Sequence, residues 1–119
     1  MSYPSLVPYL LVGDARALIS FLETAFGATV RVAVPGEGAK IMHGELTLGD
    51  GVIFVSDCVE TPRVTYLCHY VADVDATYAA ALAAGALSVS PPEDKEYGQR
   101  LAGVKDPAGN VWWICAELG

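Results

Sequence analysis

The chain has 119 residues and carries 7 Lys and Arg against 14 Asp and Glu, so its formal net charge is −7. This length predicts a single domain over residues 1–119, and a content of 53% hydrophobic and 18% charged residues is typical of a globular protein. An acidic chain without a cluster of basic residues is repelled by phosphate, which argues against nucleic acid and against an anionic membrane surface as partners.

The N-terminus and the cysteines bear on where the protein resides. The first 14 residues hold only a short apolar run with no basic region before it. Neither a signal peptide nor a membrane span is therefore expected. Cys58, Cys68 and Cys115 are odd in number and lack the spacing of a metal site. A reduced, cytoplasmic location is the simplest interpretation.

The first half of the chain alternates between strand and helix patterns. Asp14 is positioned to cap a helix whose apolar residues recur at helical spacing, and Gly27 supplies a left-handed stop. Apolar or alternating runs bounded by Gly and Pro predict strands on both sides of this helix. We therefore expect, in order, a strand over 6–12, the helix up to residue 26, and strands over 28–34, 40–48 and 52–56.

The second half repeats this order. An Ala-rich helix is predicted from a cap at Asp75 to residue 84, and Gly85 ends it. The other expected elements are a strand over 66–72, a strand over 86–90, a loop over 91–98, a partial strand over 97–105 and a strand over 111–116. We expect a first repeat over 4–57, a linker over 58–64 and a second repeat over 65–117.

Matching residues indicate that the two halves are copies of one unit. Tyr9 corresponds to Tyr70 at an offset of 61, as the two capping aspartates also do, and Phe54 corresponds to Trp113 at an offset of 59. An internal repeat of this length is a strong architectural signal. Two βαβββ units predict an α+β fold in which curved mixed sheets form an incomplete barrel, with helices outside and a pocket on the concave side.

A hairpin near the C-terminus predicts which residues face that pocket. Residues 106–110 favour a tight turn with Gly109 at positive φ. After the turn, the adjacent Trp112 and Trp113 must point to opposite faces of a strand. We expect Trp112 in the core beneath a helix, and Trp113 on the cavity side. Cys115 alternates with Trp113 and is expected on the same face, by default as a small hydrophobic group.

These segments together resemble the vicinal oxygen chelate superfamily, which contains glyoxalases, bleomycin-resistance proteins and extradiol dioxygenases. The resemblance covers essentially the whole chain and is carried by YLLVGDARALISFLETAFGA, YVADVDATYAAALAAGA and DPAGNVWW. The shorter sequences AFGA, HGEL and YGQR are similar to the PhnB-like branch. In metal-dependent members, a divalent ion lies in the concave pocket and is held by the first and last strands of each half.

The resemblance implies that the metal-ligand positions are mostly lost in this chain. It places Phe54 and Trp113 at two of the four positions and Val7 or Pro8 at a third, and none of these side chains binds metal. Only His69, at the fourth position, offers a donor. A divalent ion requires at least three N, O or S ligands from the protein. We therefore expect neither a metal nor another cofactor.

His43 and Glu45 leave a weaker alternative open. They are two residues apart on one expected strand and so share a face. Together with His69 they would make a shifted metal site, or an acid–base pair without metal. A sheet face that is open to solvent gives the same pattern.

Several residues of the expected ligand pocket have two interpretations. Phe54 and Trp113 form either a stacking platform for a flat ligand or a plug that turns the cavity into core. His69 is either a ligand contact or a hydrogen-bonded strand residue, and Arg100 binds either a ligand carboxylate or phosphonate or an acidic residue of the chain itself. The complete expected pocket is Val7, Tyr9, Phe54, His69, Trp113, Arg100, Tyr97 and Cys115.

The leading hypothesis is a small-molecule-binding protein without metal, similar to the drug-sequestering members of the superfamily. It is expected to be a homodimer, because a half-barrel has open strand edges and an exposed apolar rim. One alternative is a metal-dependent lyase, isomerase or dioxygenase that uses the shifted His and Glu site. The other is a catalytically silent structural relative in which side chains fill both cavities.

Overall fold

The computed structural model describes residues 3–57 and 62–119, and all of its helices and strands lie within these ranges. The first half contains β1 (Tyr9–Val12), α1 (Ala15–Phe26), β2 (Thr29–Pro35), β3 (Ile41–Leu48) and β4 (Gly51–Asp57). The second half contains β5 (Tyr66–Tyr70), α2 (Val74–Ala83), β6 (Leu87–Lys95), β7 (Gln99–Lys105) and β8 (Val111–Glu117). The predicted α+β order of two βαβββ units is confirmed.

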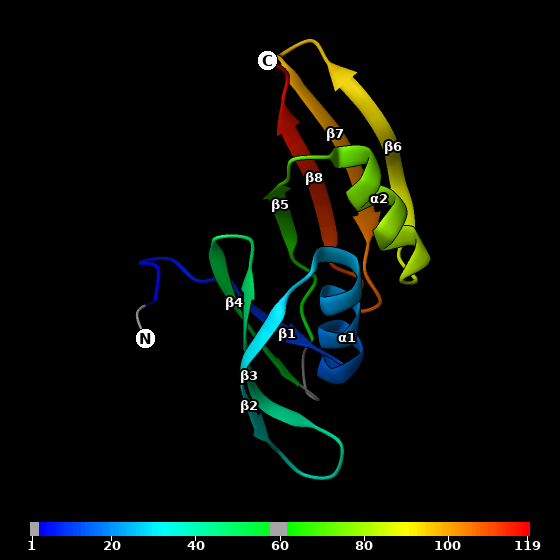
Figure 1. The fold of residues 1–119 in the computed structure, drawn as a ribbon. Coiled ribbons are helices and arrows are strands. Elements are labelled where there is room, and N and C mark those ends of the chain that lie inside the picture. The colour runs from blue at the N-terminus through cyan, green and yellow to red at the C-terminus, as the bar shows by residue number, and fades with distance from the viewer. Residues whose placement is uncertain (1–2, 58–61) are drawn as a thin grey trace.

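Each half forms its own four-stranded mixed sheet. The strand orders are β1-β4-β3-β2 and β5-β8-β7-β6, which are the same arrangement twice. In each sheet the first strand runs parallel to the last, and the other neighbours are antiparallel. The two sheets follow one another along the long axis, with α1 and α2 packed against each other (Figure 1). Neither sheet closes into a barrel by itself.

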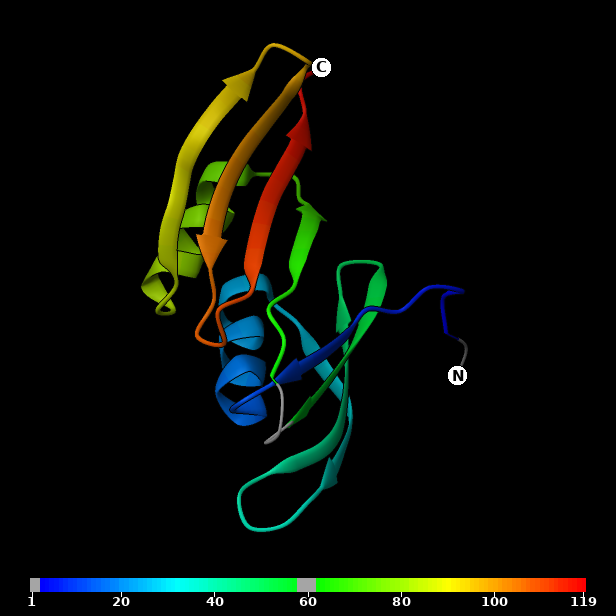
Figure 2. The same cartoon turned by 180° about the vertical axis from the view of Figure 1, so that it is seen from behind.

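The hydrophobic core lies between the helices and one face of each sheet. Leu18 and Leu22 of α1 are fully buried, as are Leu10, Val55 and Ile114 on the strands. Seen from behind, the second sheet lies in front of α2, so its other face has no helix over it (Figure 2). We call this helix-free side of each sheet its open face. No helix in the described part of the chain is long and apolar enough to cross a membrane.

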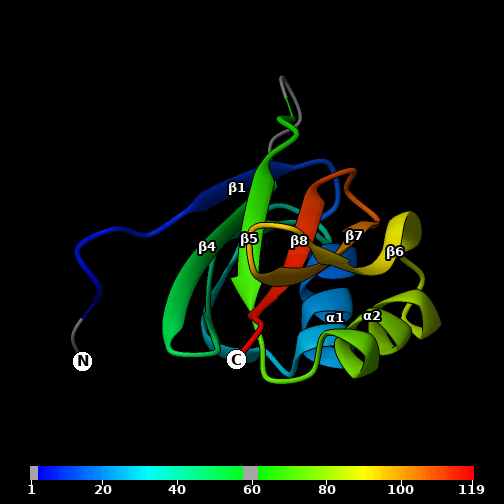
Figure 3. The same cartoon turned by 90° about the horizontal axis from the view of Figure 1, so that it is seen from above.

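The start of the chain differs from the expected strand over 6–12. β1 begins at Tyr9, because the preceding Pro8 has no N–H for a strand ladder; its carbonyl still accepts a bond from Phe54 N at 3.0 Å. Residues 3–8 form an arm that extends from the body of the protein (Figure 3). Residues 58–61, which include most of the expected linker and Cys58, lie outside the described residues.

The cap of the second helix lies two residues before the predicted one. The carboxylate of Asp73 accepts a hydrogen bond from Ala76 N at 3.0 Å, as that of Asp14 does from Ala17 N at 3.1 Å. Asp75 lies inside the first turn of α2. The two capping residues are therefore 59 apart, 73 minus 14, and not 61. The offset of 59 is the one that also relates Phe54 to Trp113.

Most of the loop expected over 91–98 is strand instead. β6 continues through both prolines that follow Ser90, with register shifts on either side of Ser90. β6 is the edge strand of its sheet. An edge strand tolerates proline, because one side of its backbone needs no partner, and bulges absorb the remaining misfit.

The β7–β8 hairpin is held by one buried carboxylate. Asp106 is 4% exposed, and its oxygens accept from Ala108 N at 2.8 Å, Asn110 N at 2.9 Å and Trp112 Nε1 at 2.8 Å. The side-chain carbonyl of Asn110 accepts from Thr65 N at 2.9 Å, which ties the turn to the start of β5. Asp106 therefore fixes both the turn and the rotation of the core indole.

Asp106→Ala should lower the free energy of unfolding by at least about 3 kcal/mol, because it leaves several buried donors without an acceptor. Urea unfolding followed by circular dichroism measures the change. Asp50→Ala removes the same charge from an exposed turn and should change stability by less than about 0.5 kcal/mol. Equal effects of the two substitutions would contradict the role given to Asp106.

Candidate functional site

The pairing of parallel strands determines which residues occupy the open faces. Tyr9 lies beside Phe54, and Cys68 lies beside Trp113. Cross-strand neighbours point to the same side of a sheet, so Tyr9 shares the open face with Phe54, and Cys68 shares it with Trp113. The repeat therefore places Phe54 and Trp113 in equivalent positions, one in each sheet.

The first-strand neighbours of Phe54 and Trp113 are not the residues that the resemblance implied as their partners. Tyr9 and Cys68, not Val7 or Pro8 and His69, stand beside the two aromatic residues. His69 is level with the buried Ile114, so it points to the helix side. A shift of one residue along a strand exchanges the two faces, and this is how His69 leaves the predicted cavity.

A pocket of about 450 Å³ lies around Trp113 on the open face of the second sheet. Trp113 is half-buried, whereas Tyr70 and Tyr97 at the rim are mostly exposed. This surface, which we call the Trp113 pocket, includes two of the other predicted residues, Tyr97 and Cys115. Its full lining is Cys68, Tyr70, Ser90, Lys95, Tyr97, Gln99, Leu101, Trp113 and Cys115.

Gly103 makes it possible for the Trp113 ring to lie flat on the sheet. Gly103 is paired with Trp113 across β7 and β8. A Cβ atom added at Gly103 would lie 2.7 Å from a carbon of the indole ring. Any side chain there would lift the ring from the sheet, so the glycine preserves a broad aromatic surface at the base of the pocket.

A second aromatic group occupies the open face of the first sheet. We call it the Tyr9 cluster, and it consists of Tyr3, Tyr9, His43, Glu45 and Phe54. The Phe54 ring centroid lies 5.9, 5.7 and 4.9 Å from those of Tyr3, Tyr9 and His43, all edge-to-face. Such contacts are favourable for aromatic rings and fix the orientation of Phe54.

Hydrogen bonds connect the polar atoms of the Tyr9 cluster. Glu45 Oε1 accepts from the hydroxyl of Tyr3 at 2.7 Å, and Glu45 Oε2 lies 2.8 Å from His43 Nε2. A proton on His43 Nε2 leaves Nδ1 free to accept from the Tyr9 hydroxyl, 3.4 Å away. The Tyr3 and His43 bonds hold the pKa of Glu45 below its ordinary value, and the Glu45 bond raises the pKa of Tyr3.

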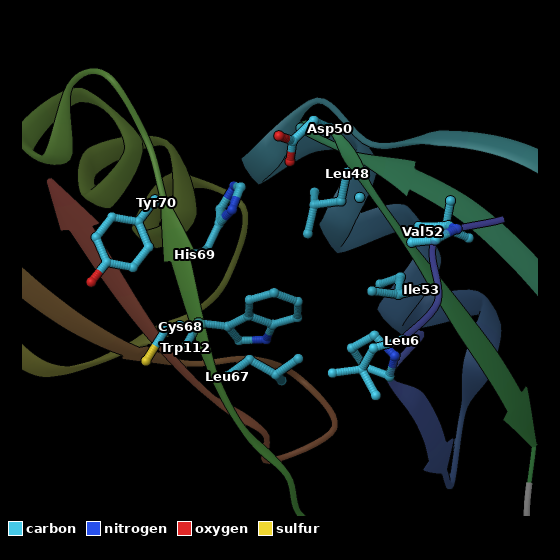
Figure 4. A pocket seen from close by; sticks show the side chains of 14 residues that line it. Leu6, Leu48, Asp50, Val52, Ile53, Leu67, Cys68, His69, Tyr70 and Trp112 are labelled. Carbon is cyan, nitrogen blue, oxygen red and sulfur yellow. The ribbon is translucent and has the colours of Figure 1, made fainter.

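The structure contains a further pocket, between the two sheets, that the sequence did not reveal. It has a volume of about 630 Å³, with Leu67, His69 and Trp112 on one side and Leu48 and Ile53 on the other (Figure 4). His69 lies 5.1 Å from the ring of Phe26 and 6.4 Å from that of Trp112, measured between centroids. No local sequence pattern predicts this pocket, because its walls come from both halves of the chain and it forms only where the two sheets meet.

Arg100 lies away from the Trp113 pocket. Its Nε and Nη2 atoms each donate to Asp75 at 2.9 Å, and Nη1 donates to Asp94 at 2.8 Å. Of the two interpretations, the structure shows the pair with acidic residues of the chain. Another arginine, Arg31, was not identified from the sequence and lies with its guanidinium carbon 5.1 Å from the centroid of Tyr3.

Phe54 and Trp113, which the resemblance places at metal-ligand positions, and their neighbours Tyr9 and Cys68 do not fit a divalent ion. Phe54 and Trp113 have hydrocarbon or indole rings there, and Tyr9 and Cys68 add one phenol and one thiol. Burial also raises the pKa of the neighbouring thiol, Cys115, to about 11, which disfavours a thiolate ligand. Three N, O or S donors are needed, and these four positions do not supply them.

The shifted set of His43, Glu45 and His69 is not assembled either. His43 and Glu45 are on the open face of the first sheet, whereas His69 is on the helix side of the second. Across residues 3–57 and 62–119, no three His, Cys, Asp or Glu side chains gather closely enough to bind a metal ion. The remaining His43–Glu45 pair is able to exchange a proton but supplies only two ligands.

His69 should make stability depend on pH. Burial lowers its pKa from the ordinary 6.5, so the unfolded chain takes up a proton at a higher pH than the folded one. The free energy of unfolding should therefore fall as the pH drops from about 7.5 to about 5.5. His69→Phe keeps an aromatic ring beside Phe26 and should flatten this decline in urea unfolding curves. An unchanged slope in the variant would show that His69 is not its source.

Comparison with known proteins agrees with this geometry. The family model described as "Glyoxalase/Bleomycin resistance protein/Dioxygenase superfamily" matches residues 5–114. An uncharacterized protein of Mycobacterium bovis is 35% identical over 124 aligned positions, which cover 92% of this chain and 80% of that protein. A counterpart in Mycobacterium tuberculosis has the same identity, with 72% of its length covered.

Solved structures show the same fold. TioX from a Micromonospora species superposes with a TM-score of 0.83 at 28% identity, over 99% of this chain and all of TioX. A gene product of Arabidopsis thaliana superposes with a TM-score of 0.70 at 26% identity, over 95% of this chain and 98% of the plant protein. With its repeated βαβββ units and the match over 5–114, this chain belongs to the glyoxalase/bleomycin resistance protein/dioxygenase superfamily.

Proposed function

We propose that this protein binds a small aromatic or amphipathic molecule without metal, in the manner of the sequestering, drug-resistance type of this superfamily. The observation that carries the proposal is the pair of equivalent open faces. Each presents an aromatic ring, Phe54 or Trp113, and the resemblance implies that metal-dependent relatives hold a metal ligand at these positions. Flat rings on a largely apolar surface favour stacking with a flat ligand.

The active form in this proposal is a homodimer. Phe54 and Trp113 are on separate sheets, and Phe54 does not line the Trp113 pocket. A second copy would allow the open face of the first sheet to cover the open face of the second sheet of its partner. Exposed Tyr9, Tyr70 and Tyr97 would then be shielded from water, which is a poor environment for so many rings.

The remaining features of the proposal rest on the sequence and on local chemistry. We keep the PhnB-like branch, the single domain with repeats over 4–57 and 65–117, and a reduced, cytoplasmic setting. Cys68 and Cys115 are free thiols, which agrees with such a setting.

The His43–Glu45 hydrogen bond favours a second candidate function, a proton-transfer enzyme that works without metal.

Trp113→Ala should weaken binding of a flat aromatic compound at least about tenfold, because the variant loses the stacking surface of the pocket. Titration of an aromatic panel by calorimetry measures this, and treatment with EDTA should leave the affinities unchanged. Leu87→Ala truncates an exposed apolar residue that does not line the pocket, and it is the matched control. Unchanged affinity in Trp113→Ala would refute the stacking role, and loss of binding in EDTA would favour a metal-dependent enzyme.

Light scattering should give about twice the monomer mass of 12.5 kDa, because dimerisation covers the two open faces. Tyr70→Glu places a charge on the open face of the second sheet and should shift the protein toward monomer. Ala79→Glu, on the exposed surface of α2, is the control and should leave the dimer intact. A wild-type particle of monomer mass at all concentrations would contradict the dimer.

A further inference from the structure

Arg31 is directed onto the open face of the first sheet by an irregularity in β2. The pairing of β2 with β3 is regular at Val30, opposite Leu46, and resumes at Val32, opposite Glu45. Arg31 is the extra residue between these two pairs. A bulge of this kind reorients a side chain out of the normal alternation and is common beside functional sites. Here it brings Arg31 to the same side as Tyr3.

One edge of the Arg31 guanidinium is buried without a hydrogen-bond partner. Its Nε and Nη2 atoms are inaccessible to water, and no acceptor among the described residues contacts them. Burying a charged donor without an acceptor costs free energy, so native proteins rarely leave one in this state. The bare edge therefore requires an explanation.

Arg100 shows what the same edge does when an acceptor is present. Its Nε and Nη2 atoms both donate to the two carboxylate oxygens of Asp75, each at 2.9 Å. This fork is the preferred geometry between a guanidinium and a carboxylate. The corresponding two atoms of Arg31 are those that lack a partner. The Nε and Nη2 atoms of Arg100 are thus paired with a carboxylate, whereas those of Arg31 have no acceptor among the described residues.

The nearest acidic residue does not supply an acceptor to this edge of Arg31. Arg31 and Glu45 both contact Tyr3, through its ring and its hydroxyl respectively, so the two side chains lie near one another. The oxygens of Glu45 are already engaged, Oε1 with Tyr3 and Oε2 with His43. Asp50 borders the same pocket but makes no ion pair with Arg31. Residues 3–57 and 62–119 thus offer this edge no acceptor, and a bound molecule is able to supply one.

The space beside Arg31 has room for such an acceptor. A pocket of about 480 Å³ is bordered by Arg31, Tyr3, Thr47 and Val52. Tyr3, whose ring partly covers the guanidinium, belongs to the arm that precedes β1. The same ring contacts Phe54. The pocket therefore has a cationic group at Arg31 beside an aromatic ring at Tyr3 and an apolar side chain at Val52.

We propose that Arg31 binds the carboxylate of the small molecule through the Nε and Nη2 edge, so that the ligand is an aromatic or amphipathic carboxylic acid. This inference rests on the proposed binding function and names the chemical class of its ligand. The carboxylate replaces the missing acceptor when the Tyr3 ring, which lies over the guanidinium, moves aside to admit it. The apolar part of the molecule then lies against Tyr3 and Val52, which border the same pocket. A carboxylate fits better than a more highly charged anion, because the chain has a net charge of −7 and repels multiple negative charges.

Two probes of nearly equal shape test this, namely 2-naphthoate, which is an anion, and its neutral amide, 2-naphthamide. Calorimetry at constant ionic strength should show wild-type protein binding 2-naphthoate at least about tenfold more tightly than 2-naphthamide. Arg31→Gln should abolish this preference by weakening only the anion. Unchanged 2-naphthamide affinity in the variant shows that the site is still folded.

Arg63→Gln is the matched control. It removes the same charge from an exposed residue, so it reproduces any long-range electrostatic effect, and it should keep the tenfold preference. A preference that survives in Arg31→Gln, or equal wild-type affinities for the two probes, overturns the carboxylate inference and leaves the binding function standing. Binding of neither probe counts against both.

Discussion

The alternation of side chains along a strand is the constraint on which this structure depends. Trp112 and Trp113 are adjacent in sequence, yet one is buried under the helices and the other lies on the open face. Because each sheet is covered on one side only, every strand is divided into residues that stabilise the fold and residues available for binding. Gly103 on one face and Asp106 in the adjoining turn hold the two indoles in these roles.

Local sequence patterns were sufficient to predict the order of helices and strands in each half. The hairpin over 106–110, the cap at Asp14 and the stop at Gly27 each depend on a few consecutive residues, and all three are present as predicted. The repeat then predicted two similar βαβββ units, and the structure contains two sheets with the same strand order. The strand through the prolines of β6 was missed, because its tolerance of proline comes from a position at the sheet edge that no local pattern reveals.

The errors at the candidate site follow from register. Aligning the halves at an offset of 61 instead of 59 preserves the face of a strand residue, since two residues make one full period. The offset of 61 pairs Asp14 with Asp75, whereas the cap of α2 is Asp73. On a helix, a difference of two residues is a rotation of about 200°, so the two aspartates do not share a face. His69 shows the opposite case, because a difference of one residue from Cys68 moved it from the open face to the helix side.

Neither the repeat nor the alternation of side chains along a strand predicts the direction of Arg31, because a bulge interrupts the alternation at this residue. From the sequence, its neighbours Val30 and Val32 bracket an ordinary polar position in a strand. Only the pairing with β3 shows that an extra residue is inserted there and that its guanidinium turns toward the rings of the Tyr9 cluster. The two open faces then differ in chemistry despite their common origin. The second sheet offers a broad indole surface, whereas the first adds a cation beside its aromatic rings. In the dimer that we propose, a ligand between two such faces would stack on one side and be oriented by charge on the other.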